Sequence, residues 1–434
     1  NNLDTIFSSA SNFQKSALKI IRISGEHANI VPLIFSFKPT QPRLASLRKL
    51  HDHNNQIIDN ALVIFFPGPH TATGENIIEL HLHGSLVIEK KIFQMLGKQK
   101  NFRIAEPGEY TKRAFLNGII DLTQAEGLND LINAETENQF KISMSQFEGI
   151  LSEKINSWRT NIVFLLSKLE ALIDFSDEDL PFDLERLFAE NIIDLLTDMK
   201  LSIKSSSFGE RLRNGFVITL IGRPNVGKSS LINFLSDRKV AIVTKEPGTT
   251  RDVLEVLLDF DGYPIILNDT AGIRSTKSEI EKIGIKNAIE KADKSDLILI
   301  LSDNENFSFT EIKKSSRTIL VHTKSDLVKL NKKNVHEISV KENTGIDKLI
   351  KIIVNHLKSL EPKENALLTR ERHVQAVKRA SDALKRASLS NLNINPELAA
   401  EDLRVAATAI GSITNNIDVE EILDDIFSSF CIGK

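Results

Sequence analysis

The chain has 434 residues, a formal net charge of -3 at pH 7 and one cysteine, Cys431. Its length predicts roughly two to four domains, each large enough to bury its own core. The slightly negative charge excludes a protein coated in basic surface, so any contact with nucleic acid should be local or shared with a partner. One cysteine excludes an internal disulfide framework. We expect no signal peptide and no membrane span, and we therefore predict a cytoplasmic protein.

The amino-terminal segment, residues 1–117, mixes short apolar runs with turn signals. Strands are predicted over residues 18–23, 61–66 and 77–83, because each is a short apolar run of the length typical of strands. A helix is predicted to follow over residues 85–96. This mixture indicates an α+β domain.

A helical region is predicted over residues 118–210, where glycine and proline become rare and apolar residues recur three or four positions apart. The apolar stripe consists of Leu151, Ile155, Trp158, Ile162, Leu165, Leu166 and Leu169. The acidic stretch 174–179 interrupts the pattern, and a further helix is predicted to end at Ile203.

Strand-like and helix-like runs alternate over residues 211–362, which is typical of a parallel sheet with crossover helices. The chain becomes helical again over residues 363–434, where Pro396 suits the first turn of a helix capped by Asn395. Because helical stretches flank the α/β unit on both sides, we predict that this unit is inserted into one helical domain.

The most informative stretch is residues 222–229, GRPNVGKS, which fits the phosphate-binding loop of nucleotide triphosphatases. A buried strand over residues 216–221 should lead into this loop, and a helix over residues 230–235 should lead out of it. Successive backbone N–H groups would then converge on phosphate oxygens at a helix N-terminus. Lys228 would reach the β- and γ-phosphates, and the Ser229 hydroxyl would bind Mg²⁺.

Three later motifs follow in the order that a GTPase needs. They are GTTRD at 248–252, DTAG at 269–272 and TKSD at 323–326. A threonine hydroxyl of the first motif would bind Mg²⁺ once the γ-phosphate is present. In the second motif, Asp269 would hold a metal-bound water, and the N–H of Gly272 would sense the γ-phosphate.

The carboxylate of Asp326 would select guanine, because it accepts hydrogen bonds from N1–H and from the exocyclic amine, and adenine has no such pair of donors. Residues 339–341, SVK, would close over the base through backbone groups. The first residue of TKSD is more often Asn, so Thr323 is a departure, as is Val340, where Ala is usual. Together these motifs predict a guanine-nucleotide domain.

In many small GTPases a glutamine after the DxxG motif orients the attacking water, and here Ile273 stands at that position. Another residue must therefore orient the water during hydrolysis. Asn225, with carbonyls of residues 244–250, is a candidate ligand for a monovalent cation that would act in place of an arginine finger. Glu281 is a candidate for orienting the water. An ordinary loop asparagine and a solvated helix glutamate are alternatives that fit the spacing equally well.

Several blocks outside the nucleotide motifs are not part of a general GTPase pattern. They are DTI at 4–6, the segment 18–25, FPGP at 66–69, TGE at 73–75, EPGE at 106–109, RAFLNG at 113–118, DLTQAE at 121–126 and the tail IFSSFCIGK at 426–434. With these blocks the chain resembles, over nearly its full length, the bacterial tRNA modification GTPase family MnmE, also called TrmE.

The resemblance implies a multidomain α/β and α fold. It makes residues 1–117 an α+β domain that binds a tetrahydrofolate and dimerises. It makes residues 118–210 and 363–434 two parts of one helical domain, and residues 211–362 an inserted Ras-like GTPase domain with a phosphate loop.

Potassium-stimulated GTP hydrolysis is also implied by the resemblance. The K⁺ ligands would be Asn225, Thr244, Glu246 and Thr249. The Mg²⁺ ligands would be Ser229 and Thr250, and Glu281 would orient the water. The GTP-contacting residues would be Asn225, Val226, Gly227, Lys228, Ser229, Ser230, Thr244, Lys245, Glu246, Pro247, Gly248, Thr249, Thr250, Asp269, Thr270, Ala271, Gly272, Thr323, Lys324, Asp326, Ser339, Val340 and Lys341.

For the amino-terminal domain, the resemblance implies a tetrahydrofolate derivative, in the 5,10-methylene or 5-formyl form, that supplies a one-carbon unit. Arg22, Glu79 and Lys434 fall on the folate-contacting positions. Ile119 stands where a lysine is expected, so that contact is predicted to be absent or replaced. Cys431 would be a catalytic thiol, and an inert buried cysteine is the alternative from the sequence alone.

The resemblance further implies a homodimer that forms a heterotetramer with the flavoprotein MnmG (GidA), which uses FAD and NADH. The pair would act on tRNA, adding a carboxymethylaminomethyl or aminomethyl group to C5 of the wobble uridine. A GTPase switch for ribosome assembly is the alternative, since its nucleotide domain would look alike. An assembly factor would more often carry a basic RNA-binding appendage, so the first reading is favoured.

Overall fold

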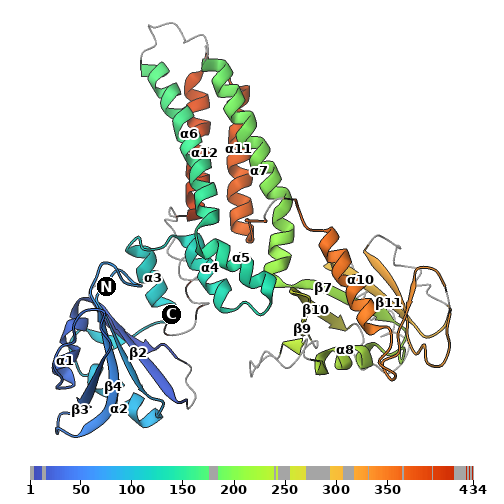
Figure 1. The fold of residues 1–434 in the computed structure, drawn as a ribbon. Coiled ribbons are helices and arrows are strands. Elements are labelled where there is room, and N and C mark those ends of the chain that lie inside the picture. The colour runs from blue at the N-terminus through green and yellow to red at the C-terminus, as the bar shows by residue number, and fades with distance from the viewer. Residues whose placement is uncertain are drawn as a thin grey trace, which may run out of the picture. The chain divides into compact units, whose positions relative to one another are not determined.

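The structure is a computed structural model. It describes residues 4–11, 16–174, 184–238, 241–242, 255–269, 294–305, 317–330, 332–363, 366–392 and 394–414, with Phe427, Phe430 and Gly433. The chain forms two compact units, residues 1–129 with 411–434 and residues 130–410 (Figure 1). Among the described residues, no helix is both long enough and apolar enough to cross a bilayer.

A six-stranded sheet in the order β3-β4-β5-β2-β1-β6 forms the first unit. Its strands are β1 (Thr5–Ser9), β2 (Leu18–Ser24), β3 (Ser46–His51), β4 (Ile57–Phe66), β5 (Ile77–His83) and β6 (Phe102–Ile104). Neighbouring strands are antiparallel, except that β1 and β6 are parallel. Along β2, Ile21 and Ile23 are buried while Arg22 between them is partly exposed, because successive side chains of a strand point to opposite faces.

Helices accompany this sheet. They are the 3₁₀ helix η1 (Glu26–Ile30), α1 (Val31–Ile34), α2 (Leu86–Leu96), α3 (Glu109–Leu116) and α4 (Leu122–Ile132), the last of which reaches the second unit. Helix α2 begins after Ser85, whose hydroxyl accepts from the N–H of Val87 at 3.3 Å, a typical helix cap. Ile92 and Leu96 of α2 join the core of the sheet. The predicted α+β organisation is confirmed.

Long helices lie side by side in the second unit (Figure 1). They are α6 (Ile150–Asp174), α7 (Leu184–Asn214), α11 (Glu371–Leu389) and α12 (Pro396–Thr414), and the shorter α5 (Glu137–Phe147) precedes them. The Arg404 guanidinium on α12 lies 3.0 Å from Glu170 on α6. The predicted stripe of α6 is buried almost throughout, and Trp158 donates from its indole N–H to Asp198 of α7 at 2.8 Å.

Helix α7 is longer than predicted, since it ends at Asn214 rather than at Ile203. The added turns contain serines and a glycine, which are weak helix formers. Tertiary packing outweighs this propensity, because Phe208 and Leu212 are buried in the core of the following sheet, with the Phe208 and Phe216 ring centroids 5.6 Å apart. The hydroxyl of Ser206 also bonds the carbonyl of Ile203 at 2.7 Å, within the helix.

The α/β part of the second unit is a seven-stranded sheet in the order β13-β12-β11-β7-β10-β9-β8. Its strands are β7 (Phe216–Gly222), β8 (Ala241–Ile242), β9 (Glu255–Phe260), β10 (Tyr263–Asp269), β11 (Leu297–Ser302), β12 (Thr318–His322) and β13 (Val335–Glu337). Strands β13, β12, β11, β7 and β10 are parallel, whereas β9 and β8 each run antiparallel to their neighbours.

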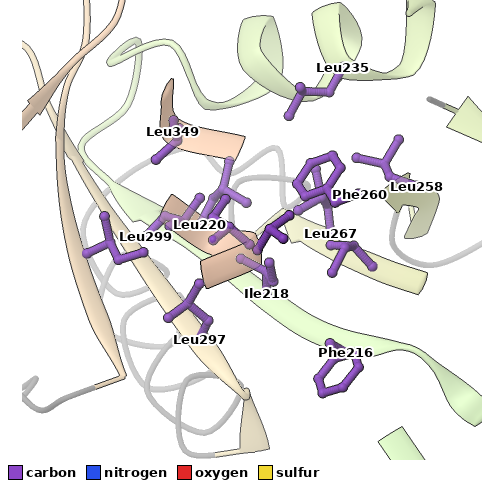
Figure 2. Packing of buried hydrophobic residues seen from close by; sticks show 14 of the residues in the cluster. Phe216, Ile218, Leu220, Leu235, Leu258, Phe260, Leu267, Leu297, Leu299 and Leu349 are labelled. Atoms are coloured by element: carbon purple, nitrogen blue, oxygen red, sulfur yellow. The ribbon is translucent and has the colours of Figure 1, made fainter. Parts of the chain in front are cut away.

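Helices α8 (Lys228–Asp237) and α10 (Ile346–Ser359) pack on this sheet. Figure 2 shows Leu235 of α8 and Leu349 of α10 with side chains from β7, β9, β10 and β11, including Leu220. Strand β11 is buried along its whole length, as expected of a central parallel strand covered on both faces. The predicted fold class, a helical domain with an inserted phosphate-loop α/β domain, is confirmed. The domain limits at residues 117, 210 and 362 remain predictions.

Candidate guanine-nucleotide site

The predicted nucleotide motifs follow strands that end at one edge of the seven-stranded sheet. The parallel strands β7, β10, β11, β12 and β13 end at Gly222, Asp269, Ser302, His322 and Glu337. Ligands of open parallel sheets bind outside the carboxyl ends of the strands. The topology therefore brings motifs that are up to about a hundred residues apart in the chain to a common edge.

The phosphate loop, residues 222–229, connects β7 to α8. Asn225 and Gly227 have positive φ angles of 62° and 105°. This backbone conformation points successive N–H groups towards the inside of the loop, where they can bind an anion. At Gly222 the reason for glycine is space, because a Cβ atom would lie 2.7 Å from the carbonyl oxygen of Leu301. At Gly227 the space is open, so its backbone conformation is the reason.

Lys228 begins α8, and its side chain lies against the phosphate loop. Its Nζ donates to the carbonyl oxygens of Gly222 at 2.6 Å and Arg223 at 3.1 Å, and the residue is only 6% exposed. Ser229 and Ser230 follow in the first turn of α8 and are exposed. A cation and two hydroxyl groups thus occupy the positive end of a helix, which favours a phosphate group.

The base loop, residues 323–328, is tied to the phosphate loop by two side chains. The Thr323 hydroxyl donates to the carbonyl of Val226 at 2.7 Å, and Lys324 Nζ donates to the carbonyl of Asn225 at 2.9 Å. Lys324 Nζ also lies 2.9 Å from Asp303 Oδ2, and this bond lowers the pKa of the Asp303 carboxyl. The two loops therefore form one connected surface.

Asp326 is held by a side chain from the loop after β13. The Ser339 hydroxyl donates to Asp326 Oδ1 at 2.6 Å, and this hydrogen bond is the main cause that lowers the pKa of the Asp326 carboxyl below 3.8. Ser339 is itself fixed, because its backbone exchanges two 3.0 Å hydrogen bonds with Thr344. The result is an ionised and oriented carboxylate at an exposed position, which suits the two donors of guanine.

The sequence assigned only backbone roles to residues 339–341, so the hydroxyl of Ser339 is a functional group that sequence reasoning missed. The available signal was topological, because Asp326 and Ser339 follow neighbouring parallel strands. Val340 packs partly buried against the core, and Lys341 is exposed. Asp303 was also missed, and it likewise follows the end of a strand, β11.

Part of the predicted site lies outside the described residues. These positions are Thr244, Lys245, Glu246, Pro247, Gly248, Thr249, Thr250, Thr270, Ala271, Gly272, Ile273, Glu281, Cys431 and Lys434. For Asp269 the backbone is described, as the last residue of β10. The assignments of these residues to K⁺, to Mg²⁺, to the water, to folate and to a catalytic thiol remain predictions.

In the first unit, two of the predicted folate residues lie together. Arg22 on β2 and Glu79 on β5 are cross-strand neighbours, and Arg22 Nε donates to Glu79 Oε1 at 2.9 Å. The other carboxylate oxygen of Glu79 is 3.3 Å from His81 Nε2. The Tyr110 hydroxyl donates to the carbonyl of Arg22 at 2.7 Å, which fixes the strand beside this pair.

Ile119, which replaces an expected lysine, lines an open hollow of about 480 Å³ in the first unit. Phe115, Ile120, Asp121 and Gln124 also line it. The Asp121 N–H bonds to the Gln124 side chain at 3.0 Å, so these polar groups cap the start of α4. Ile119 is 42% exposed and brings no charge to the hollow.

The seven-stranded sheet, its phosphate loop and the oriented carboxylate of Asp326 define a phosphate-loop protein that binds guanine nucleotides. Comparison with sequence families adds two matches: "MnmE helical domain" over residues 122–431 and "GTP-binding protein TrmE N-terminus" over residues 5–119. The chain therefore belongs to the MnmE family of tRNA modification GTPases. The predicted resemblance is confirmed, and the predicted enzyme class, a GTP hydrolase of tRNA modification, agrees with this membership.

Individual relatives match over nearly the whole chain. The tRNA modification GTPase MnmE of Bradyrhizobium sp. (strain ORS 278) is 40% identical, with 99% of each chain covered. The protein of the same name from Pelagibacter ubique (strain HTCC1062) is 42% identical over 96% of this chain and 97% of its own. Among solved structures, the G domain of the T. maritima FeoB iron transporter is 27% identical over 32% of this chain and 98% of its own, with a TM-score of 0.26.

Proposed function

We propose that this protein is a potassium-stimulated GTP hydrolase that acts with the flavoprotein MnmG on certain tRNAs. The pair adds a carboxymethylaminomethyl or aminomethyl group to C5 of the wobble uridine. The observation that supports this most directly is the nucleotide site, in which the base loop is tied to the phosphate loop and Ser339 orients Asp326. This site belongs to a chain that is similar from end to end to tRNA modification GTPases.

The phosphate loop would hold the β- and γ-phosphates. The Lys228 ammonium, now on two loop carbonyls, would exchange these neutral partners for charged phosphate oxygens, which form stronger hydrogen bonds. Ser229, exposed in the first turn of α8, fits a Mg²⁺ ligand, with Thr250 as the second. When bound, Mg²⁺ neutralises the charge that develops on the phosphates during transfer.

Asn225 is the residue of the phosphate loop that we assign to K⁺. Its carbonyl oxygen already accepts from Lys324 Nζ, so the side-chain amide oxygen is the atom that we assign to the cation. Asn225 is exposed, and an amide oxygen is a suitable ligand for a hard cation. Thr244, Glu246 and Thr249 would supply the remaining ligands.

Glu281 is the group that we assign to the attacking water. Ile273 has no hydrogen-bonding side chain, so the position used by many small GTPases is unable to orient the water. A carboxylate that accepts a hydrogen bond from the water would align it with the γ-phosphate. Replacing Glu281 by alanine should therefore abolish most turnover while nucleotide affinity is retained.

The Arg22–Glu79 pair supports a tetrahydrofolate site in the first unit. The two side chains present guanidinium donors and a carboxylate acceptor next to each other, and they are 27% and 16% exposed. A bound folate, in the 5,10-methylene or 5-formyl form, would supply the one-carbon unit. Lys434 would contact it with a positive charge, Ile119 would contact it only through apolar atoms, and Cys431 would serve as the catalytic thiol.

The proposed assembly is a homodimer that forms a heterotetramer with MnmG. The partner would bring FAD and NADH, and tRNA would be the common substrate. Because this chain has a net charge of -3, we expect the partner to provide much of the positive surface that tRNA requires. The cytoplasm is the compartment in which we place the reaction.

The experiment that tests the tRNA function is nucleoside analysis of tRNA from cells that lack this protein. We expect the modified wobble uridine to disappear, and to return when the wild-type gene is restored. A Lys228→Ala gene should fail to restore it. Unchanged wobble uridines in the deletion strain would contradict the proposal, and defective ribosomal subunits would favour the ribosome-assembly alternative.

The potassium assignment has its own test, which compares GTP turnover in K⁺ and Na⁺ at equal ionic strength. We expect faster turnover in K⁺ for the wild type and equal, slow turnover in both salts for Asn225→Ala. Asn233→Ala, an exposed position on α8, serves as a matched control. Equal rates of the wild type in the two salts would remove Asn225 from the mechanism.

A further inference from the structure

Thr323 occupies a buried position between the phosphate loop and the base loop. It is 3% exposed, and its hydroxyl lies 2.7 Å from the carbonyl of Val226 and 3.3 Å from that of Ser302. Both neighbours are acceptors, and a hydroxyl has one hydrogen to donate. That hydrogen is therefore committed to a carbonyl of the protein, with the phosphate-loop carbonyl as the shorter contact.

Guanine presents two different edges to a protein. Its N1–H and exocyclic amine are donors, which the Asp326 carboxylate is oriented to accept. On the other side of the ring system, N7 and O6 are acceptors, and they need a donor from the protein. When Asp326 holds the N1 edge, N7 faces away from Asp326, because the two lie on opposite sides of the ring system, and Thr323 at the other end of the TKSD motif is the side chain we consider for a contact there.

Three side-chain donors of this region contact acceptors within the protein. The Thr323 hydroxyl donates to Val226, the Ser339 hydroxyl donates to Asp326, and Lys324 Nζ contacts the carbonyl of Asn225 and the carboxylate of Asp303. A side-chain amide at position 323 would differ, because its NH₂ group carries two hydrogens. It would donate one to the phosphate loop and keep the other for the base.

We propose that Thr323 restricts guanine recognition to the N1 edge, so that the site binds guanine nucleotides without a side-chain contact to N7. Thr323 acts as a positioning residue, since its hydroxyl holds the two loops together and Asp326 supplies the selectivity. This inference deepens the proposed function and rests on the GTP site described above. The chemical consequence is tolerance of guanine analogues altered at N7 and rejection of those altered at the exocyclic amine.

The test measures affinities of the full-length protein for GDP, 7-deaza-GDP and IDP in a competition assay with a fluorescent guanine nucleotide. In 7-deaza-GDP a C–H replaces N7, and IDP lacks the exocyclic amine. We expect GDP and 7-deaza-GDP to bind within about twofold of each other, because no hydrogen bond is lost. IDP should bind about tenfold or more weakly, because the Asp326 carboxylate loses a charge-assisted hydrogen bond.

Variants at position 323 identify the residue responsible. Thr323→Asn should acquire a preference for GDP over 7-deaza-GDP of about fivefold, the size of one neutral hydrogen bond. Thr323→Ser, which keeps one hydroxyl hydrogen, should keep the ratio near one. Thr323→Val, which removes the link to Val226, should weaken binding of both nucleotides by the same factor. Thermal unfolding with and without GDP establishes that each variant is folded.

Two results would overturn the inference. One is a wild-type protein that binds GDP at least fivefold more tightly than 7-deaza-GDP, which would show that another group reads N7. The other is a folded Thr323→Asn variant that still fails to distinguish these nucleotides, which would show that position 323 is not the determinant. Absence of any GDP binding would instead contradict the GTP site itself, and with it the proposed function.

Discussion

The two ends of the seven-stranded sheet are built in different ways. At the carboxyl ends of the strands, polar loops are joined by a few hydrogen bonds, such as the one from Thr323 to Val226. At the opposite end, aromatic side chains are buried, and the Phe216 and Tyr263 ring centroids lie 6.0 Å apart. The groups that suit nucleotide binding and the groups that stabilise the fold therefore lie at opposite ends of the same strands.

Ion pairs lie at the packed end, where the sheet meets the helices of the same unit. Asp296, just before β11, accepts from the N–H of Val217 at 2.9 Å and lies 2.6 Å from Arg211 of α7. Asp130 lies 2.9 Å from both Arg213 and Arg370, and thereby connects helical segments on either side of the inserted sheet. Removing these groups should affect folding more than nucleotide binding.

The β9–β10 hairpin spans both ends of the sheet. Strand β9 starts at Glu255, shortly after the GTTRD motif, and β10 ends at Asp269, the first residue of DTAG. The turn between the strands lies at the packed end, where the Asn138 N–H donates to the carbonyl of Gly262 at 3.4 Å. One hairpin therefore connects two nucleotide motifs with the helices.

The largest effect is expected at the carboxyl end, from Lys228→Ala. Loss of the ammonium removes the positive charge that would stabilise the transferring phosphoryl group, so kcat for GTP should fall by a factor of about 10²–10³. The midpoint of thermal unfolding without nucleotide should change little. Turnover and unfolding assays check both statements, and a large loss of stability would contradict the separation of roles.

A large loss of stability is expected at the packed end, from Asp130→Asn. The Asp130 side chain is 11% exposed and faces two arginines, Arg213 and Arg370, and both would lose this carboxylate. The free energy of unfolding of the second unit should fall by about 3 kcal/mol. Denaturant unfolding measures this change, and Glu137→Gln, which breaks an exposed pair with Lys141, is the control with an expected change below about 0.5 kcal/mol.

If GDP affinity fell as strongly as stability in Asp130→Asn, the two ends of the sheet would not be separable. We expect GDP affinity to remain within about threefold of the wild type at a temperature where the variant is fully folded.

A smaller effect is expected from Tyr263→Phe, also at the packed end. The phenol of Tyr263 donates to the carboxylate of Glu361, and burial, followed by this hydrogen bond, raises the pKa of the phenol above 10. Removing the hydroxyl should cost about 1 kcal/mol of unfolding free energy, while the buried ring keeps its packing. Calorimetry of the two proteins checks this, and a variant as stable as the wild type would show that the bond adds nothing.

The smallest effect is a pH dependence that distinguishes the two ends. Burial raises the pKa of the Asp296 carboxyl above 3.8, although the hydrogen bond from Val217 and the nearby arginines act to lower it. In contrast, the hydrogen bond from Ser339 lowers the pKa of the Asp326 carboxyl. A carboxyl whose pKa is raised on folding adds stability below the unfolded pKa and loses it as pH rises through the folded pKa. Relative to Asp296→Asn, the wild type should therefore gain stability as pH falls towards 3.8.

Unfolding at several pH values between about 4 and 7 measures this difference, with the Asp326→Asn variant as the comparison. Since the pKa of Asp326 is lowered on folding, the wild type should lose stability relative to this variant as pH falls towards 3.8, which is the opposite direction to Asp296. A constant difference for Asp296→Asn, or one of the same direction as for Asp326→Asn, would contradict the raised pKa at the packed end.

The phosphate loop and the elements around it could be predicted because they depend on neighbouring residues. The strand before the loop and the helix from Lys228 follow from local apolar patterns, and the glycines at 222 and 227 suit a tight turn. The end of α7 was not predictable in this way. Its last turns contain weak helix formers, and Phe208 and Leu212 are stabilised by a sheet formed later in the chain.

The sequence by itself determined the family and the nucleotide motifs and predicted the base that Asp326 would select, since these depend on residue types at fixed short spacings. The tertiary structure decided which groups support those motifs. Thr323 bonds to Val226, 97 residues away in the chain, and Ser339 bonds to Asp326 from the loop after the next strand. Such contacts depend on parallel strands that end at one edge, and only the folded sheet brings those ends together.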